Sequence, residues 1–191
     1  MFFSKRNKLL KSCVHYFNTL DQLQIVILKC YLRRDYKINQ TIYNQHIHKI
    51  RLKILKTIQK IRCLGLHSAL IDINQLTNLY EIIFSLDTLK SRVKDHTTFE
   101  VCENEIKHIT ESLSHLLQYI VFILNKKRKN QHPHLKMDAL ITDFAYKTQA
   151  FEELYRSTLQ VVSAHPIVFL FFERDLKALR HELESFLLRF S

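Results

Sequence analysis

Glycine and proline are almost absent from this chain, and their scarcity limits the folds that it can adopt. Only one Gly and two Pro occur in 191 residues. Folds with many strands need frequent tight turns, and those turns draw on Gly and Pro for their backbone angles. The sequence therefore predicts an all-α protein with few connections and argues against all-β and nucleotide-binding α/β folds.

Apolar residues recur at three- and four-residue steps, as amphipathic helices require. This repeat predicts six helices, over residues 3–32, 39–64, 68–94, 98–127, 134–162 and 167–190. Gly65 is placed to end the second helix, and Pro133 and Pro166 are placed to open the last two. Long helices with short links favour an elongated antiparallel bundle of about five to six helices. We expect residues 1–191 to form a single helical-bundle domain.

The same repeat predicts which side of each helix is buried. In the second helix the expected core face consists of isoleucines at helical spacing, namely Ile42, Ile47, Ile50, Ile54, Ile58 and Ile61. In the last helix we expect Leu170 and Leu179 to be buried. A buried position is one where truncation to Ala leaves a cavity and destabilises the fold.

The net charge of +11 is concentrated in the first third of the chain. Residues 1–64 contain 14 Lys and Arg but only two acids, Asp21 and Asp35, whereas residues 65–191 contain 15 Lys and Arg and 16 acids. The domain is thus divided into basic helices over residues 1–64 and charge-balanced helices over residues 65–191. A one-sided basic segment indicates an anionic neighbour, which is a nucleic acid, a phospholipid surface or an acidic protein.

The second predicted helix carries the candidate binding site. Four lysines follow one another at steps of four, three and four residues, so they form a stripe beside the isoleucine face. Two arginines accompany them on the same helix. The candidate anion- or partner-binding residues are Lys49, Arg51, Lys53, Lys56, Lys60 and Arg62. A solvated helix face would show the same stripe.

Catalytic, metal and cofactor sites are not expected. A chain with one glycine cannot contain a nucleophile elbow or a phosphate-cradling loop. The sequence Glu105-Ile106-Lys107-His108 has the spacing found in di-metal bundles, but the required second copy is missing because Ala178 precedes His181 by three residues. We expect no enzymatic activity, no metal and no cofactor.

The spacing of the cysteines and the length of the apolar runs indicate the cellular compartment. Cys13, Cys30, Cys63 and Cys102 are far apart in sequence and form no CxxC pair, so we expect reduced, mostly buried thiols. No apolar run reaches the roughly 18–20 residues that span a bilayer. We expect a bacterial cytoplasmic protein that is peripheral to the inner membrane.

Two stretches resemble a known family. Residues 79–86 and 89–95, with Thr98, Phe99, Cys102, Glu105 and Ile106, resemble the cytoplasmic helical region of the fusaric-acid-resistance (FUSC, aromatic acid exporter-like) family. Residues 165–172, with Leu176, Ala178 and Leu179, are similar to helices near the C-terminus of that family. The resemblance implies a helical accessory domain of an exporter assembly, and it implies no catalytic residue.

These observations together lead to an expected function. We expect a non-enzymatic helical domain that acts through protein–protein contact at or near a membrane face, similar to the accessory region of a FUSC-like exporter. One alternative is a free-standing adaptor or bacterial effector that binds an acidic protein. Another is a nucleic-acid-binding helical bundle.

Overall fold

The computed structural model describes residues 2–31, 40–64, 71–90, 102–129, 137–159 and 166–189. The helices in these ranges are α1 (Phe2–Tyr31), α2 (Gln40–Cys63), α3 (Ile73–Lys90), α5 (Glu103–Arg128), α6 (Met137–Leu159) and α7 (Pro166–Leu188). The described ranges contain no strand, so the predicted all-α class is confirmed. Pro166 opens α7 as expected, whereas Gly65 and Pro133 lie outside the described residues.

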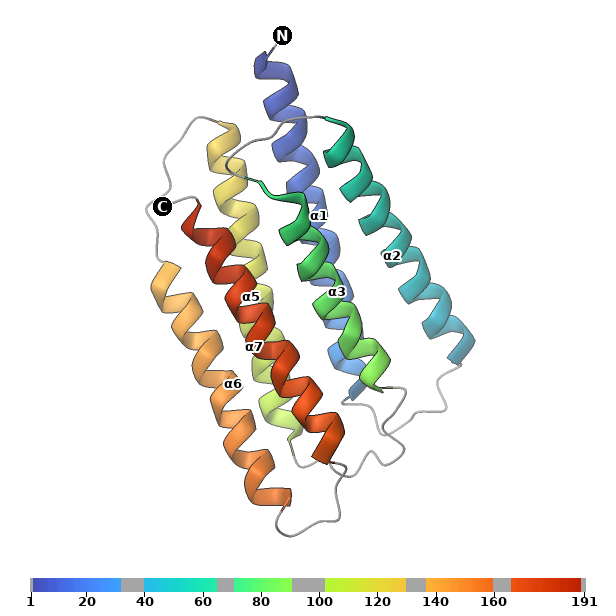
Figure 1. Cartoon of the computed structure of the whole chain (residues 1–191), viewed down its shortest axis with the longest axis vertical. Coiled ribbons are helices and arrows are strands. Elements are labelled where there is room, and N and C mark those ends of the chain that lie inside the picture. The colour runs from blue at the N-terminus through green and yellow to red at the C-terminus, as the bar shows by residue number, and fades with distance from the viewer. Residues whose placement is uncertain are drawn as a thin grey trace.

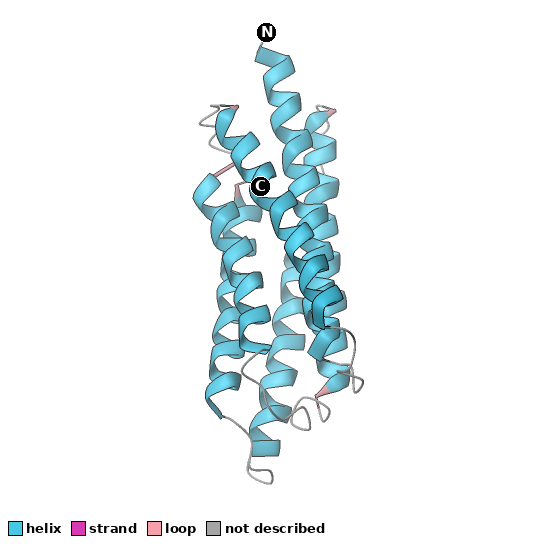
Figure 2. Ribbon diagram, turned by 90° about the vertical axis from the view of Figure 1, so that its right-hand side faces the viewer, coloured by secondary structure: helices cyan, strands magenta, loops and turns pink. Residues whose placement is uncertain are grey.

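The helices pack along one long axis as an elongated bundle, with successive helices running in opposite directions (Figures 1 and 2). α1 lies centrally, because it packs against α5, α2 and α3. α7 packs against α3 and α6, and α5 packs against α6. α2 packs mainly against α1 and α3, which leaves the opposite side of α2 at the surface of the bundle.

The core is apolar and rich in aromatic rings. α1 and α5 place most of their Leu and Ile residues, together with Phe17, toward the centre, and each such side chain contributes roughly 1.5–3 kcal/mol when it is fully buried. Between α6 and α7 the rings of Tyr155 and Phe169 stack with their centroids 3.7 Å apart. The buried hydroxyls of Tyr16 and Tyr31 donate to the backbone carbonyls of Leu76 and Leu86 on α3, so these two rings also satisfy their polar groups.

The predicted buried face of α2 is confirmed from Ile47 to Ile61, but the prediction for Ile42 is wrong. Ile42 is 60% exposed. Its neighbour Tyr43 takes the position against α3 and donates a hydrogen bond of 2.6 Å to the Asp87 carboxylate. Because consecutive helical residues point about 100° apart, Ile42 is turned away from that contact.

In α7, Leu179 is fully buried as expected, whereas the prediction for Leu170 is wrong. Leu170 is 60% exposed. It belongs to a continuous apolar run at the start of the helix, where periodicity cannot identify the inner face. The larger rings of Phe169 and Phe172 occupy the side that packs against Phe151 of α6.

Candidate functional site

The exposed side of α2 carries the sequence-predicted cations. Lys49, Lys53, Lys56, Lys60 and Arg62 are all exposed in the structure. They are held there because the opposite side of the helix buries its isoleucines against α1 and α3. The structure therefore brings the four lysines onto one side of α2, whereas Arg62, two residues after Lys60, is exposed in another direction.

Arg51 differs from the other five, because it contacts α3. Its Nε donates a hydrogen bond of 2.9 Å to the Tyr80 hydroxyl, and its guanidinium carbon lies 3.6 Å from the centroid of the Phe84 ring. The side chain is half-buried by these contacts. Arg51 thus stabilises the α2–α3 contact, and its planar head is already occupied.

Among the described residues, no acid forms an ion pair with the lysines of α2 or with Arg62. The chain contains no Asp or Glu between Asp35 and Asp72. Within the described ranges, the α2 lysines and Arg62 form no ion pair, whereas on other helices Lys107 pairs with Glu103 at 2.7 Å and Arg180 pairs with Glu184 at 2.7 Å. The cations of α2 therefore repel one another without local compensation, and an anion bound beside them would relieve this repulsion.

Two exposed leucines of α2 lie among these cations, although the isoleucine repeat does not mark them. Leu52 is 41% exposed and Leu55 is 45% exposed. Lys49 precedes Leu52 by three residues and Lys56 follows it by four, so both are its neighbours on the helix surface. The signal in the sequence was the position of both leucines outside the isoleucine repeat. We define the α2 surface as Lys49, Leu52, Lys53, Leu55, Lys56, Lys60 and Arg62.

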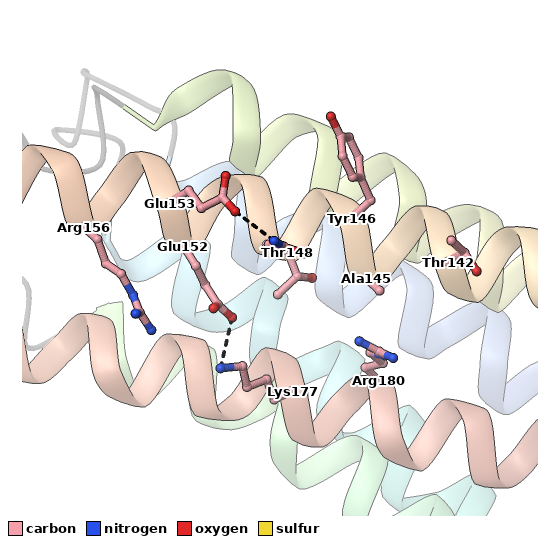
Figure 3. Close-up of a pocket in the computed structure, with 10 residues that line it drawn as sticks. Thr142, Ala145, Tyr146, Thr148, Glu152, Glu153, Arg156, Lys177 and Arg180 are labelled. Carbon is pink, nitrogen blue, oxygen red and sulfur yellow. Dashed lines mark hydrogen bonds and ion pairs between the residues drawn. The ribbon is translucent and has the colours of Figure 1, made fainter.

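A second candidate is a groove of about 550 Å³ between α6 and α7 (Figure 3). Its acids and cations face each other across the two helices. The Lys177 ammonium lies 3.3 Å from a Glu152 carboxylate oxygen, and Gln149 donates a hydrogen bond of 2.8 Å to Glu153. The groove thus has mixed charges that largely neutralise one another.

Glu173 lies beside this groove and is almost fully buried. Its Oε1 accepts from the Lys177 ammonium at 2.5 Å and lies 3.4 Å from an Arg156 nitrogen. The hydrogen bond from Lys177 to Glu173 raises the pKa of that lysine. A buried carboxylate needs a paired cation, so Lys177 and Arg156 are accounted for as structural partners of Glu173.

The structure describes the thiol groups of Cys13, Cys63 and Cys102. Burial raises the pKa of both Cys13 and Cys102 to about 12, so these thiols remain protonated and unreactive near neutral pH. Cys63, at the end of α2, is exposed, so two of the three described thiols are buried, and the side chain of Cys30 lies outside the described residues. Among the residues that the structure describes, no three His, Cys, Asp or Glu side chains are grouped to hold a metal ion.

None of the described helices is both long and apolar enough to cross a membrane. Comparison with known proteins gives no further assignment: no family model, no curated protein and no solved structure matches this chain.

Proposed function

We propose that this chain is a non-enzymatic interaction domain that acts at a cytoplasmic membrane face and binds an acidic partner protein through the α2 surface. The observation that carries the proposal is the uncompensated charge of α2, where five exposed cations have no acidic partner among the described residues. The resemblance of residues 79–106 to the cytoplasmic region of FUSC-like exporters supports a place beside a membrane protein.

The two exposed leucines favour a protein as the occupant of α2. Leu52 and Leu55 lose contact with water only against an apolar surface, and nucleic-acid phosphates offer none. An amphipathic segment with both acidic and apolar side chains satisfies the lysines and the leucines together. Direct base readout would also require side chains that enter a groove, and a single long helix packed on α1 and α3 is not arranged as a helix-turn-helix.

Site-specific crosslinking tests the proposal. A benzophenone amino acid is placed at Leu52, and a matched control carries it at Tyr146, which is 66% exposed on α6. Each protein is irradiated with the membrane fraction of the source cells. We expect an adduct from position 52 whose crosslinked peptide is acidic, and no such adduct from position 146.

A charge-reversal variant completes this test. Replacing Lys49, Lys53, Lys56 and Lys60 by Glu should abolish the adduct from position 52, while circular dichroism shows an unchanged helical signal. Raising the salt concentration should weaken the adduct of the parent protein, because exposed charges are screened. Equal adducts from positions 52 and 146, or an adduct that survives the four substitutions, would show that the α2 surface is only a solvated face.

A further inference from the structure

The antiparallel packing of α1 and α5 concentrates a second set of cations at one end of the bundle. The first three turns of α1 carry four of them and the end of α5 carries four more. These eight residues, which we call the basic end, are Lys5, Arg6, Lys8, Lys11, Lys126, Lys127, Arg128 and Lys129. In Figure 1 the start of α1 and the end of α5 lie at the same end of the molecule.

Hydrogen bonds between the two helices define their register. Gln24 Nε2 contacts the Thr110 carbonyl at 3.4 Å, and Gln118 Nε2 donates to the Asp21 carboxylate at 2.8 Å. Continuing two turns along α5 from Gln118 brings Lys126 level with the part of α1 that contains Lys8 and Lys11. The first turns of α1 extend beyond the end of α5 (Figures 1 and 2).

The parts of α1 and α5 that form this end contain no acids. Residues 1–20 and 112–137 contain no Asp or Glu. Lys5, Arg6, Lys8, Lys11 and Lys129 are exposed, and the other three cations are half-buried. At the start of α3, Asp72 forms an ion pair with Arg189, and the Arg189 Nη2 lies 3.4 Å from the Asp72 carboxylate.

At the opposite end, the described start of α7 carries charges that are paired. Where α6 ends and α7 begins, Glu173 contacts both Arg156 and Lys177, and Arg174 lies 2.8 Å from the Asp175 carboxylate. Eight of the ten Lys and Arg in residues 2–31 and 102–129 therefore lie toward one end of the long axis. An elongated body with cations at one tip is oriented by an anionic plane so that this tip faces the plane.

We infer that the basic end contacts the anionic phospholipid face of a membrane and stands the bundle upright, leaving the part of the α2 surface from Lys49 to Lys56 accessible from the side. This inference rests on the membrane location in the proposed function. Each Lys or Arg close to an anionic bilayer strengthens partitioning about fivefold. In the sequence, Phe2 and Phe3 precede Lys5 and Arg6 closely, and aromatic residues beside cations suit the headgroup region. These apolar residues favour a bilayer over a nucleic acid as the occupant.

The chain contains no Trp, so a single introduced Trp reports the contact directly. Three proteins are compared, F3W at the tip of α1, L52W on the α2 surface and Y146W on the side of α6. They are mixed with vesicles of 30% phosphatidylglycerol in brominated phosphatidylcholine. We expect a blue shift and quenching for F3W only. Quenching of L52W in place of F3W would overturn the upright orientation, and a lack of sedimentation with the vesicles would overturn membrane contact altogether.

Charge reversal distinguishes the two surfaces. Replacing the exposed Lys5, Lys8, Lys11 and Lys129 by Glu should weaken sedimentation with these vesicles at least tenfold and leave crosslinking from position 52 in detergent-solubilised membranes intact. Replacing Lys49, Lys53 and Lys56 by Glu, which leaves Lys60 near the basic end unchanged, should have the opposite pattern. Replacing the same four basic-end residues by Gln avoids new repulsion with the lipid, and sedimentation should still weaken.

A short DNA duplex tests the nucleic-acid alternative. If the parent protein binds the duplex more tightly than the vesicles, and through the same four lysines, the basic end would be assigned to nucleic acid instead.

Competition with inorganic phosphate distinguishes a bilayer surface from a single phosphate group as the ligand of the basic end. Millimolar phosphate at constant ionic strength should leave vesicle sedimentation unchanged, because attraction to a charged surface involves many headgroups together. Displacement by phosphate would indicate a discrete phosphate site and would overturn the contact with a membrane surface.

Discussion

The guanidinium of Arg51 lies 3.6 Å from the centroid of the Phe84 ring and joins α2 to α3. The same side chain donates to the Tyr80 hydroxyl at 2.9 Å. α2 makes fewer contacts with the bundle than α1 does, so this cation–π contact is one of its main polar attachments. These contacts with α3 also explain why Arg51 differs in role from the other five candidate cations of α2.

Arg51→Ala should therefore destabilise the protein, although the position is on the basic helix. A partly desolvated cation–π contact and a hydrogen bond together contribute about 1–2 kcal/mol. The free energy of unfolding in urea measures the loss. Lys53→Ala, at an exposed position of the same helix, is the control and should change stability by less than about 0.5 kcal/mol. Equal effects of both substitutions would contradict the assigned role of Arg51.

Leu179→Ala should destabilise the bundle by about 2–5 kcal/mol, because Leu179 is fully buried and the truncation leaves a cavity. Leu170→Ala removes the same atoms from a side chain that is 60% exposed, so its effect should stay within about 0.5 kcal/mol. Thermal unfolding of the two variants tests the corrected face of α7. A larger loss for Leu170 than for Leu179 would mean that the helix is rotated.

Lys177→Met should cost about 1–3 kcal/mol, because it removes the nearest cation from the buried Glu173 carboxylate. Arg180→Met is the matched control on the same helix. Arg180 pairs with Glu184 in an exposed i,i+4 arrangement, which contributes at most about 1 kcal/mol. Chemical denaturation of both variants at neutral pH gives the comparison, and similar losses would contradict the structural role of the Glu173 pair.

Asp87→Asn should stabilise the protein at pH 7. Burial raises the pKa of Asp87, with the Tyr43 hydroxyl and Arg51 acting in the opposite direction. A carboxyl with a raised pKa in the folded state costs stability above that pKa, and this cost disappears once both states are protonated. The advantage of the variant in unfolding free energy should thus vanish as the pH falls below about 4. The exposed Asp138→Asn serves as the control, and an advantage for D87N that grows toward low pH would contradict the shift.

Thiol labelling with N-ethylmaleimide at pH 8, followed by peptide mass spectrometry, should modify Cys63 at least about 100-fold faster than Cys13 or Cys102. Cys63 is exposed, whereas burial raises the pKa of the other two thiols to about 12. Unfolding in guanidinium should equalise the three rates. Rapid labelling of Cys13 in the folded protein would contradict the packing of α1.

The helices and most of their buried faces follow from the sequence alone. The isoleucine repeat of α2 and the leucine repeat of α5 encode burial locally, because a 3.6-residue period places these side chains on one side of each helix. The repeat fails at Ile42 and Leu170. Near helix ends and in continuous apolar runs, the side that becomes buried depends on which neighbouring helix is present.

Only the tertiary structure decided how charge is arranged. Counting along the chain assigns Lys126–Arg128 to a balanced region, although antiparallel packing places these residues beside the cations of α1, more than a hundred positions earlier. It also separates Arg51 from Lys49 and Lys53, because the guanidinium finds a ring and a hydroxyl on α3. Sequence spacing describes neighbours on one helix, whereas electrostatic interaction acts between side chains that are close in space, whatever their distance along the chain.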